Sequence, residues 1–231
     1  MGLMDMNSYS EMLRRFVAYR KRMGMTQEQV AEILGVSQVQ CSNLESGMTK
    51  ITDGELKSLL EAGWDISGII TGTETEYGKT ELEEALDTFG EETVFVMKLC
   101  AELMLEKAAG CCLADRDSTL SGYLALLENM VRSWQDFSMC LHVRQMLQVS
   151  QEDMAGRLGM GIRKYRDMER ENRLPNAEML LYFYEVTGYP PELFMEACDK
   201  RMFTLNRIWD RFEKKEREEI LRFVDFMRDM F

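Results

Sequence analysis

The side chains of this chain that could do chemistry indicate hydrogen-bonded recognition rather than catalysis. The single histidine, His142, excludes a histidine-dependent dyad combined with a histidine metal cluster. The sequence has no glycine-rich phosphate loop, and no Ser, Cys or Asp nucleophile has a plausible base beside it. In contrast, Gln38, Gln40 and Asn43 lie close together, and a side-chain amide both donates and accepts hydrogen bonds. We therefore expect a binding protein and not an enzyme.

The cysteines do not form a recognisable metal or redox motif. None of the six occurs in a Cys-x-x-Cys pair, and we interpret the adjacent Cys111 and Cys112 as two buried small hydrophobic residues. Reduced thiols are typical of a cytoplasmic protein. The sequence shows no apolar export signal and no run of about eighteen apolar residues. We expect no metal, no small-molecule cofactor and no membrane segment.

The amides lie in a segment that is predicted to form two short helices joined by a sharp turn. Thr26 and Gln29 form a capping-box pattern at the start of the first helix, and Gly35 provides the left-handed residue that ends it. Ser37 then caps a second helix that runs to about Leu44. The outward-facing positions of this second helix are Gln38, Val39, Gln40 and Asn43.

Further helices are predicted on both sides of this pair. One covers 12–23, and two short ones cover 54–62 and 66–70. The chain of 231 residues contains three prolines and twenty methionines, and 45% of it is hydrophobic. This composition favours an all-α protein with one to two domains.

The chain contains an internal repeat. A shift of 124 residues aligns 26–70 with 150–194 without a gap. The second copy departs from the first at three places, because Gly161 replaces Ser37, Tyr165 replaces Cys41, and Glu171-Asn172 replaces the Gly47 turn. We interpret the two segments as two copies of one fold.

The first copy resembles the phage-repressor (Cro/CI-like, or XRE-type) helix-turn-helix family, through the stretch TQEQVAEILGVSQVQCSNLESG and over about residues 10–72. The second copy also resembles it, through LHVRQMLQVSQEDMAGRLGMGIRKYRDMERENRLPNAEMLLYFYEVTGYPPELF. The resemblance implies that the second helix of each motif enters the DNA major groove while the preceding helix contacts phosphate. It further implies two scaffold ion pairs, Arg20 with Glu45 and Arg144 with Glu169. His142 aligns with Ala18, so we expect it to be solvated or to act as a cap.

Carried over residue by residue, the resemblance assigns DNA contacts in both copies. In the first copy, the candidate base readers are Gln38, Val39, Gln40 and Asn43, and the candidate phosphate contacts are Gln27, Ser37, Thr49 and Lys50. Amides suit adenine, and a valine suits the thymine methyl group. In the second copy, the corresponding positions are Ile162, Arg163, Lys164 and Asp167, with Gln151, Lys164, Arg166 and Arg173 as phosphate contacts. Arg163 suits guanine, whereas the carboxylate of Asp167 is repelled by phosphate.

The acidic charge lies mainly between the two copies. The formal net charge is −12, and residues 73–136 contribute −9 of it. Helices are predicted in this segment at 80–89, at 91–109 and from Asp117-Ser118 onwards. We interpret the segment as a helical linker, a docking layer or a dimer surface. An acidic, methionine-rich peptide groove is a further alternative. The total charge excludes a protein that coats nucleic acid through bulk positive charge, but it permits a groove reader with local basic contacts.

The sequence thus predicts four segments: a helix-turn-helix domain at 10–72, the acidic helical linker at 73–136, a second helix-turn-helix domain at 137–200, and a helical tail at 201–231. The tail carries apolar stripes that either support self-association or pack on the same chain. The expected function is a sequence-specific, double-stranded-DNA-binding regulator, a repressor that blocks polymerase at an operator. Homodimerisation through the linker or the tail is also expected. The alternative is an antitoxin-like or anti-regulator scaffold in which one motif binds a protein.

Overall fold

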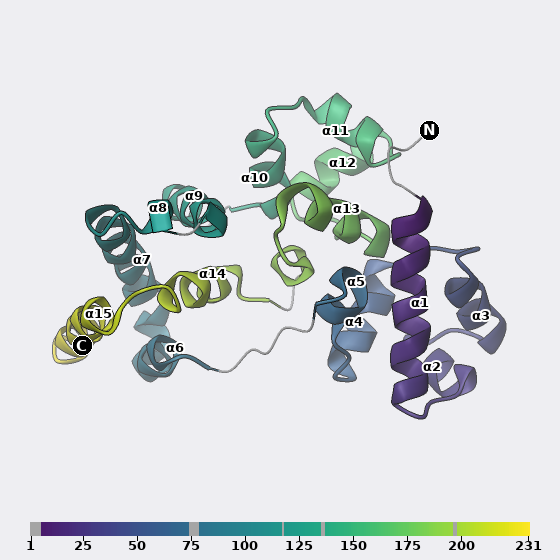
Figure 1. The fold of residues 1–231 in the computed structure, drawn as a ribbon, viewed down its shortest axis with the longest axis horizontal. Helices are drawn as coiled ribbons and strands as arrows, with labels where there is room; N and C mark the ends of the chain where they lie inside the picture. Colours follow the sequence, from purple (N-terminus) through teal and green to yellow (C-terminus); the bar gives the residue numbers. More distant parts are fainter. Residues whose placement is uncertain (1–5, 74–78, 117, 135–136, 196–197) are drawn as a thin grey trace. The chain divides into compact units, whose positions relative to one another are not determined.

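The computed structural model of the chain describes residues 6–73, 79–116, 118–134, 137–195 and 198–231. Within these ranges the regular structure is helical, without strands, which confirms the predicted all-α class (Figure 1). The chain forms two compact units, each built from two separate stretches. Unit 1 comprises Met1–Glu76 and Ser138–Cys198, and unit 2 comprises Tyr77–Phe137 and Asp199–Phe231.

The first half of unit 1 (residues 6–73) follows the predicted helix pattern. Its helices are α1 (Met6–Arg22), α2 (Gln27–Leu34), α3 (Gln38–Ser46), α4 (Asp53–Glu61) and α5 (Ile66–Thr71). The predicted capping box is confirmed, since the Thr26 hydroxyl accepts from the Gln29 amide and the Gln29 side chain accepts from Thr26. Helix α1 begins earlier than predicted, because Tyr9 is buried and its hydroxyl accepts a 3.2 Å hydrogen bond from the Ile51 N–H.

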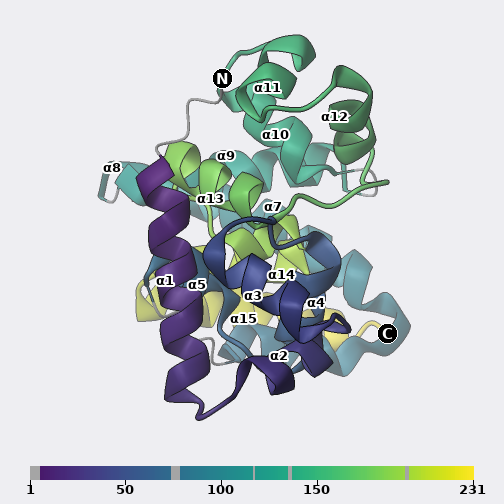
Figure 2. The same ribbon diagram turned by 90° about the vertical axis from the view of Figure 1, so that its right-hand side faces the viewer.

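The second half of unit 1 (residues 138–195) begins with a comparable series of helices. These are α10 (Met139–Met146), α11 (Gln151–Arg157), α12 (Ile162–Glu169), α13 (Ala177–Thr187) and the 3₁₀ turn η2 (Pro191–Phe194). Figure 2 shows α10, α11 and α12 gathered in one group, as α1, α2 and α3 are. Ser150 forms a capping box with Asp153, at the positions that correspond to Thr26 and Gln29.

Three left-handed turns recur at the same spacing in the two halves. In the first half they are all glycines: Gly24, Gly35 and Gly47 have φ of 69°, 66° and 78°. The corresponding residues of the second half are Gln148, Gly159 and Glu171, with φ of 53°, 64° and 57°. The second half therefore keeps the chain path at two positions where the residue type opposes it.

The two halves contact each other within unit 1. Helix α13 packs against α1 and α5, and the Ala177 N–H donates a 3.0 Å hydrogen bond to the Ile51 carbonyl oxygen. Beside it, Lys50 Nζ lies 2.9 Å from a Glu178 carboxylate oxygen. Burial of Ala177 and Ile51 on both sides of this hydrogen bond makes the contact part of the core of unit 1.

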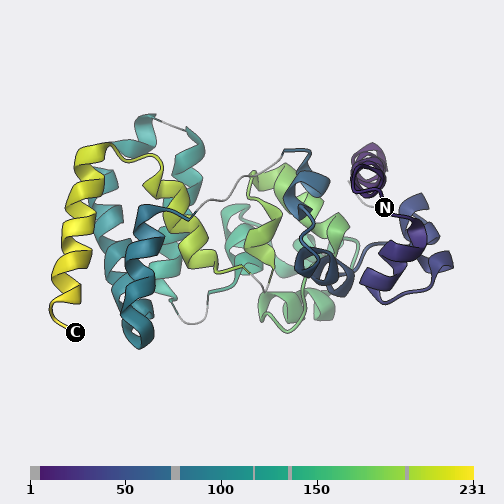
Figure 3. The same cartoon turned by 90° about the horizontal axis from the view of Figure 1, so that it is seen from below.

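Unit 2 combines the acidic segment with the C-terminal tail. Its helices are α6 (Glu81–Leu86), the 3₁₀ turn η1 (Asp87–Glu92), α7 (Thr93–Gly110), α8 (Leu113–Arg116), α9 (Ser118–Arg132), α14 (Lys200–Trp209) and α15 (Lys214–Arg228). Asp117, which was expected to begin a helix, lies outside the described residues. Helix α14 packs on α9, and α15 packs on α6 and α7 (Figure 3). The buried stripe residues of the tail are Leu205, Ile208, Trp209, Phe212, Ile220, Val224 and Met227. The tail is thus packed on its own chain.

The interpretation of Cys111 and Cys112 as buried residues is wrong. Cys111 is half-buried and Cys112 is exposed, because both lie in the short turn between the end of α7 at Gly110 and the start of α8 at Leu113. Cys112 has a positive φ of 51° in this turn. The buried thiols are those of Cys41, Cys100 and Cys140, which lie on inner helix faces.

Candidate nucleic-acid interface

Helix α3 presents a neutral polar face to solvent. Its inner side is anchored by Cys41 and Leu44, which are fully buried or nearly so. Gln38 and Gln40 are exposed, Val39 has 69% of its surface exposed, and Asn43 is half-buried. No charged residue occupies the first turn of this helix. The outer face therefore offers amide groups and one methyl-bearing side chain.

The side-chain amides of α3 differ in whether they already form hydrogen bonds within the protein. The Gln40 side-chain oxygen accepts hydrogen bonds from Ser37 N at 2.9 Å and from Ser37 Oγ at 3.0 Å, which completes a second capping box. Gln40 and Ser37 therefore set the start of the helix. Among the described residues, no hydrogen bond to the side chain of Gln38 or Asn43 occurs, so these two are the amides left for a ligand.

A buried ion pair positions the helix that precedes α3. Arg20 donates from Nε and Nη2 to the two carboxylate oxygens of Glu45, at 2.6 and 3.2 Å. Gln27 Nε2 donates to the same carboxylate at 2.7 Å. The expected Arg20–Glu45 pair is confirmed, and its carboxylate holds the Gln27 side chain at the first turn of α2.

The two predicted phosphate contacts after α3 have different environments. Thr49 is exposed. The ammonium of Lys50 lies 3.9 Å from the centre of the Tyr9 ring and is paired with Glu178 of the second half. Tyr9 and Glu178 were not anticipated as residues that shape this loop, although the apolar spacing of Tyr9 with Met12 and Phe16 would have placed it on the inner face of α1.

Helix α12 carries cations where α3 carries amides. Arg163 and Lys164 are exposed in its first turn, and no ion pair to either is found in the part of the chain that the structure describes. Ile162 and Asp167 are half-buried, and Arg173 is exposed beyond the helix end. Gly161 leaves the helix without a side-chain cap.

The scaffold beneath α12 repeats the one beneath α3. Arg144 is paired with Glu169, as expected, and Gln151 Nε2 donates to Glu169 at 2.5 Å. Burial alone would raise the pKa of Glu169, but hydrogen bonds from Arg144 and Gln151 bring it below its usual value, so the carboxylate stays ionised. Arg166 donates a 3.0 Å hydrogen bond to Gln151 Oε1, which fixes its guanidinium beside the start of α11.

The expectation that His142 is solvated is wrong. Only 3% of its surface is exposed, whereas the aligned Ala18 is on the surface. The reason is Tyr189, which follows α13 and lies against the imidazole, with Nε2 3.2 Å from the tyrosine oxygen. Burial lowers the pKa of His142 to about 4, so the ring is neutral near pH 7.

Comparison with known proteins identifies the first motif. Residues 17–62, which include α2 and α3, match the family model "Helix-turn-helix". This family consists of DNA-binding transcription regulators. No curated protein and no solved structure gave a significant match.

The described helices include none that is both long and apolar enough to cross a membrane. Over the same residues, no group of three His, Cys, Asp or Glu side chains is arranged to hold a metal ion.

Proposed function

We propose that the chain is a sequence-specific transcriptional repressor that reads DNA with α3 and, through a second helix-turn-helix domain in the second half of unit 1, with α12. The observation that carries the proposal is the face of α3. It is exposed, neutral and rich in amides, and it lies inside the segment that matches the helix-turn-helix family. In this class, the start of the second helix contacts base edges in the major groove.

On this proposal, Gln38 and Asn43 read adenine through paired donor and acceptor contacts, and Val39 packs on a thymine methyl group. Gln40 and Ser37 act mainly by holding the helix start, since they already bond each other. Half-buried Gln27 at the start of α2 and exposed Thr49 after α3 contact phosphate. The contribution of Lys50 to phosphate binding is small, because Glu178 neutralises it.

The second half is proposed to read a different sequence. A guanidinium can pair with both acceptors of guanine, which makes Arg163 the candidate reader, with Lys164 and Arg173 on phosphate. The shared hydrogen bonds of Gln151, Arg144 and Glu169 support the assignment of a second helix-turn-helix domain, since they recur at the spacing of Gln27, Arg20 and Glu45. The site on DNA would then be asymmetric, with an A·T-rich part and a G-containing part.

Repression would be steric, since a protein bound at an operator occupies the DNA that polymerase needs. Two reading helices in one chain can span about 34 Å, one DNA turn, and so replace a homodimer. The hydrogen bond from Ala177 to Ile51 and the Lys50–Glu178 ion pair hold the two halves together within unit 1. The distance between the two parts of the DNA site should therefore be constant.

Selection of bound sequences from a random DNA library, followed by fluorescence anisotropy, tests the proposal. Gln38→Ala should weaken binding to the selected site by about 5- to 150-fold and relax the preference at one base pair, because a bidentate contact contributes about 1–3 kcal/mol. Gln145→Ala, an exposed amide on α10, is the matched control and should leave affinity unchanged. Arg163→Ala should relax preference only in the other part of the site.

Two results would overturn the proposal. The first is the absence of any salt-sensitive complex that prefers one sequence over another. The second is an equal loss of affinity for all sequences in Gln38→Ala. Co-purification of a protein partner together with no retention on DNA would instead favour the scaffold function.

A further inference from the structure

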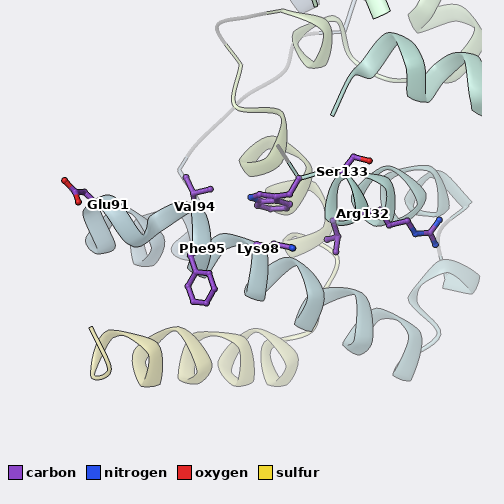
Figure 4. A pocket seen from close by; sticks show the side chains of 8 residues that line it. Glu91, Val94, Phe95, Lys98, Arg132 and Ser133 are labelled. Atoms are coloured by element: carbon purple, nitrogen blue, oxygen red, sulfur yellow. The ribbon is translucent and has the colours of Figure 1, made fainter. Parts of the chain in front are cut away.

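Unit 2 contains an open pocket between the start of α7 and the end of α9. Its volume is about 550 Å³, which lies within the range of small-molecule sites. The pocket is lined by side chains from 91–98 and from 131–134 (Figure 4). It is remote in sequence from the motif that matches the helix-turn-helix family, and the function proposed above does not use it.

The apolar part of this pocket is unusually exposed. Val94 and Phe95 on α7 have 53% and 50% of their surface exposed, and Val131 and Trp134 also line the pocket. The Phe95 ring lies edge-on to that of Phe231, with the ring centres 6.1 Å apart. Large apolar side chains that are left half-exposed beside a cavity are typical of ligand sites, because a ligand removes them from water. The aromatic character of Phe95 and Trp134 favours a flat, aromatic ligand body.

Two polar groups at the pocket have no partner among the described residues. Only 8% of the surface of Trp134 is exposed, and over the same residues its buried indole Nε1 has no hydrogen-bond acceptor. The indole is therefore a pocket-lining group whose environment a bound ligand would change. Lys98 is half-buried, and no carboxylate pairs with it in the described ranges.

Lys98 is the charged residue nearest the middle of the pocket, because the charged side chains at the rim point away from it. Figure 4 shows the Glu91 carboxylate pointing away from Lys98 and Arg132 extending outwards. Arg132 is also close to Glu128, with 3.5 Å between Nη2 and a carboxylate oxygen. The pocket therefore combines one ammonium group with the indole of Trp134 and the apolar side chains of Val94 and Val131.

We propose that this pocket binds a small aromatic carboxylate. The carboxylate pairs with the Lys98 ammonium, while the ring system lies against Val94 and beside the indole of Trp134. Unit 2 would then be a sensory unit that takes an organic acid as its signal.

Nuclear magnetic resonance of the full chain labelled with ¹⁵N tests the site directly. The three tryptophans give three indole N–H resonances, and Trp134→Phe identifies the one from the pocket. Titration with 1-naphthoate should shift that resonance in a saturable manner and leave the other two nearly unchanged. The neutral isostere 1-naphthamide should bind at least about 10-fold more weakly, because it lacks the charge that Lys98 pairs with.

Lys98→Met removes the charge and keeps the apolar stem, so it should weaken 1-naphthoate binding by about 10-fold or more. Lys215→Met, which removes a cation on α15 outside the pocket, is the matched control and should bind normally. Unchanged spectra of the other two indoles report that each variant is folded. Equal affinity for the acid and the amide, undiminished binding by Lys98→Met, or no shift of the Trp134 resonance would each overturn the proposal.

Discussion

The two halves of unit 1 share a scaffold but differ on their outer surfaces. Both contain an arginine–glutamate pair that is 25 residues apart and a glutamine that donates to the same glutamate. In contrast, the first turn of α3 is neutral and that of α12 has two exposed cations. The residues that stabilise each half are therefore different from those that would contact a partner. The scaffold is retained while the outer surface changes.

The halves also differ in how well the local sequence suits the chain path. Of the three left-handed turns that recur in both halves, glycine occupies all three in the first half but only one in the second, where Gln148 and Glu171 take the same conformation. Helix α3 has a hydroxyl cap and α12 has none. In the second half, tertiary contacts must therefore offset local costs that the first half does not have.

Removal of the scaffold arginines should have the largest effect, and a similar one in each half. Arg144→Met leaves Glu169, with 7% of its side chain exposed, as a buried charge without its cation. We expect a loss of about 4 kcal/mol in the free energy of unfolding, and Arg20→Met should cost about as much. Urea unfolding followed by helical circular dichroism measures both. A loss below about 1 kcal/mol in either half would show that the two ion pairs are not equivalent.

Acidification should distinguish the halves through His142, since the aligned residue in the first half is Ala18. Burial lowers the pKa of the folded imidazole to about 4 from 6.5, so the unfolded chain takes up the proton first. The neutral imidazole therefore contributes to the free energy of unfolding. This contribution is complete above about pH 6.5 and is lost as the pH falls through 4, by about 3 kcal/mol in total. His142→Gln should remove this part of the pH dependence in unfolding experiments at pH 7 and pH 4. Parallel profiles for the two proteins would contradict the assignment.

The left-handed turns should give the smallest effect, with opposite signs in the two halves. Glu171→Gly should stabilise the protein by about 1 kcal/mol, because glycine adopts a positive φ without steric cost. Gly47→Ala should destabilise it, since φ is 78° there and the added Cβ would lie 3.0 Å from Leu13 Cδ1. Thermal unfolding measures both variants. A destabilising Glu171→Gly would indicate that side-chain contacts of Glu171 outweigh its backbone strain.

Local patterns predicted the elements of the first motif well. Interactions within a few residues set the caps at Thr26 and Ser37, the turn at Gly35, and the extent of α2 and α3. The structure confirms each of these. The roles of Lys50 and His142 could not be predicted in this way. Each depends on a residue far along the chain, Glu178 for Lys50 and Tyr189 for His142, and no local spacing reports such a contact.

Local sequence patterns were sufficient to predict the helical class, the start and end of the motif helices, and the amide-rich face of α3, because caps, glycine turns and helical periodicity act over one or two turns. In contrast, the packing of the acidic segment with the tail in one unit, and the presence of Lys98 and Trp134 at one pocket, became visible in three dimensions alone. Such contacts escape local patterns because apolar burial is non-directional, so it selects partners by fit across the whole chain rather than by neighbouring residues.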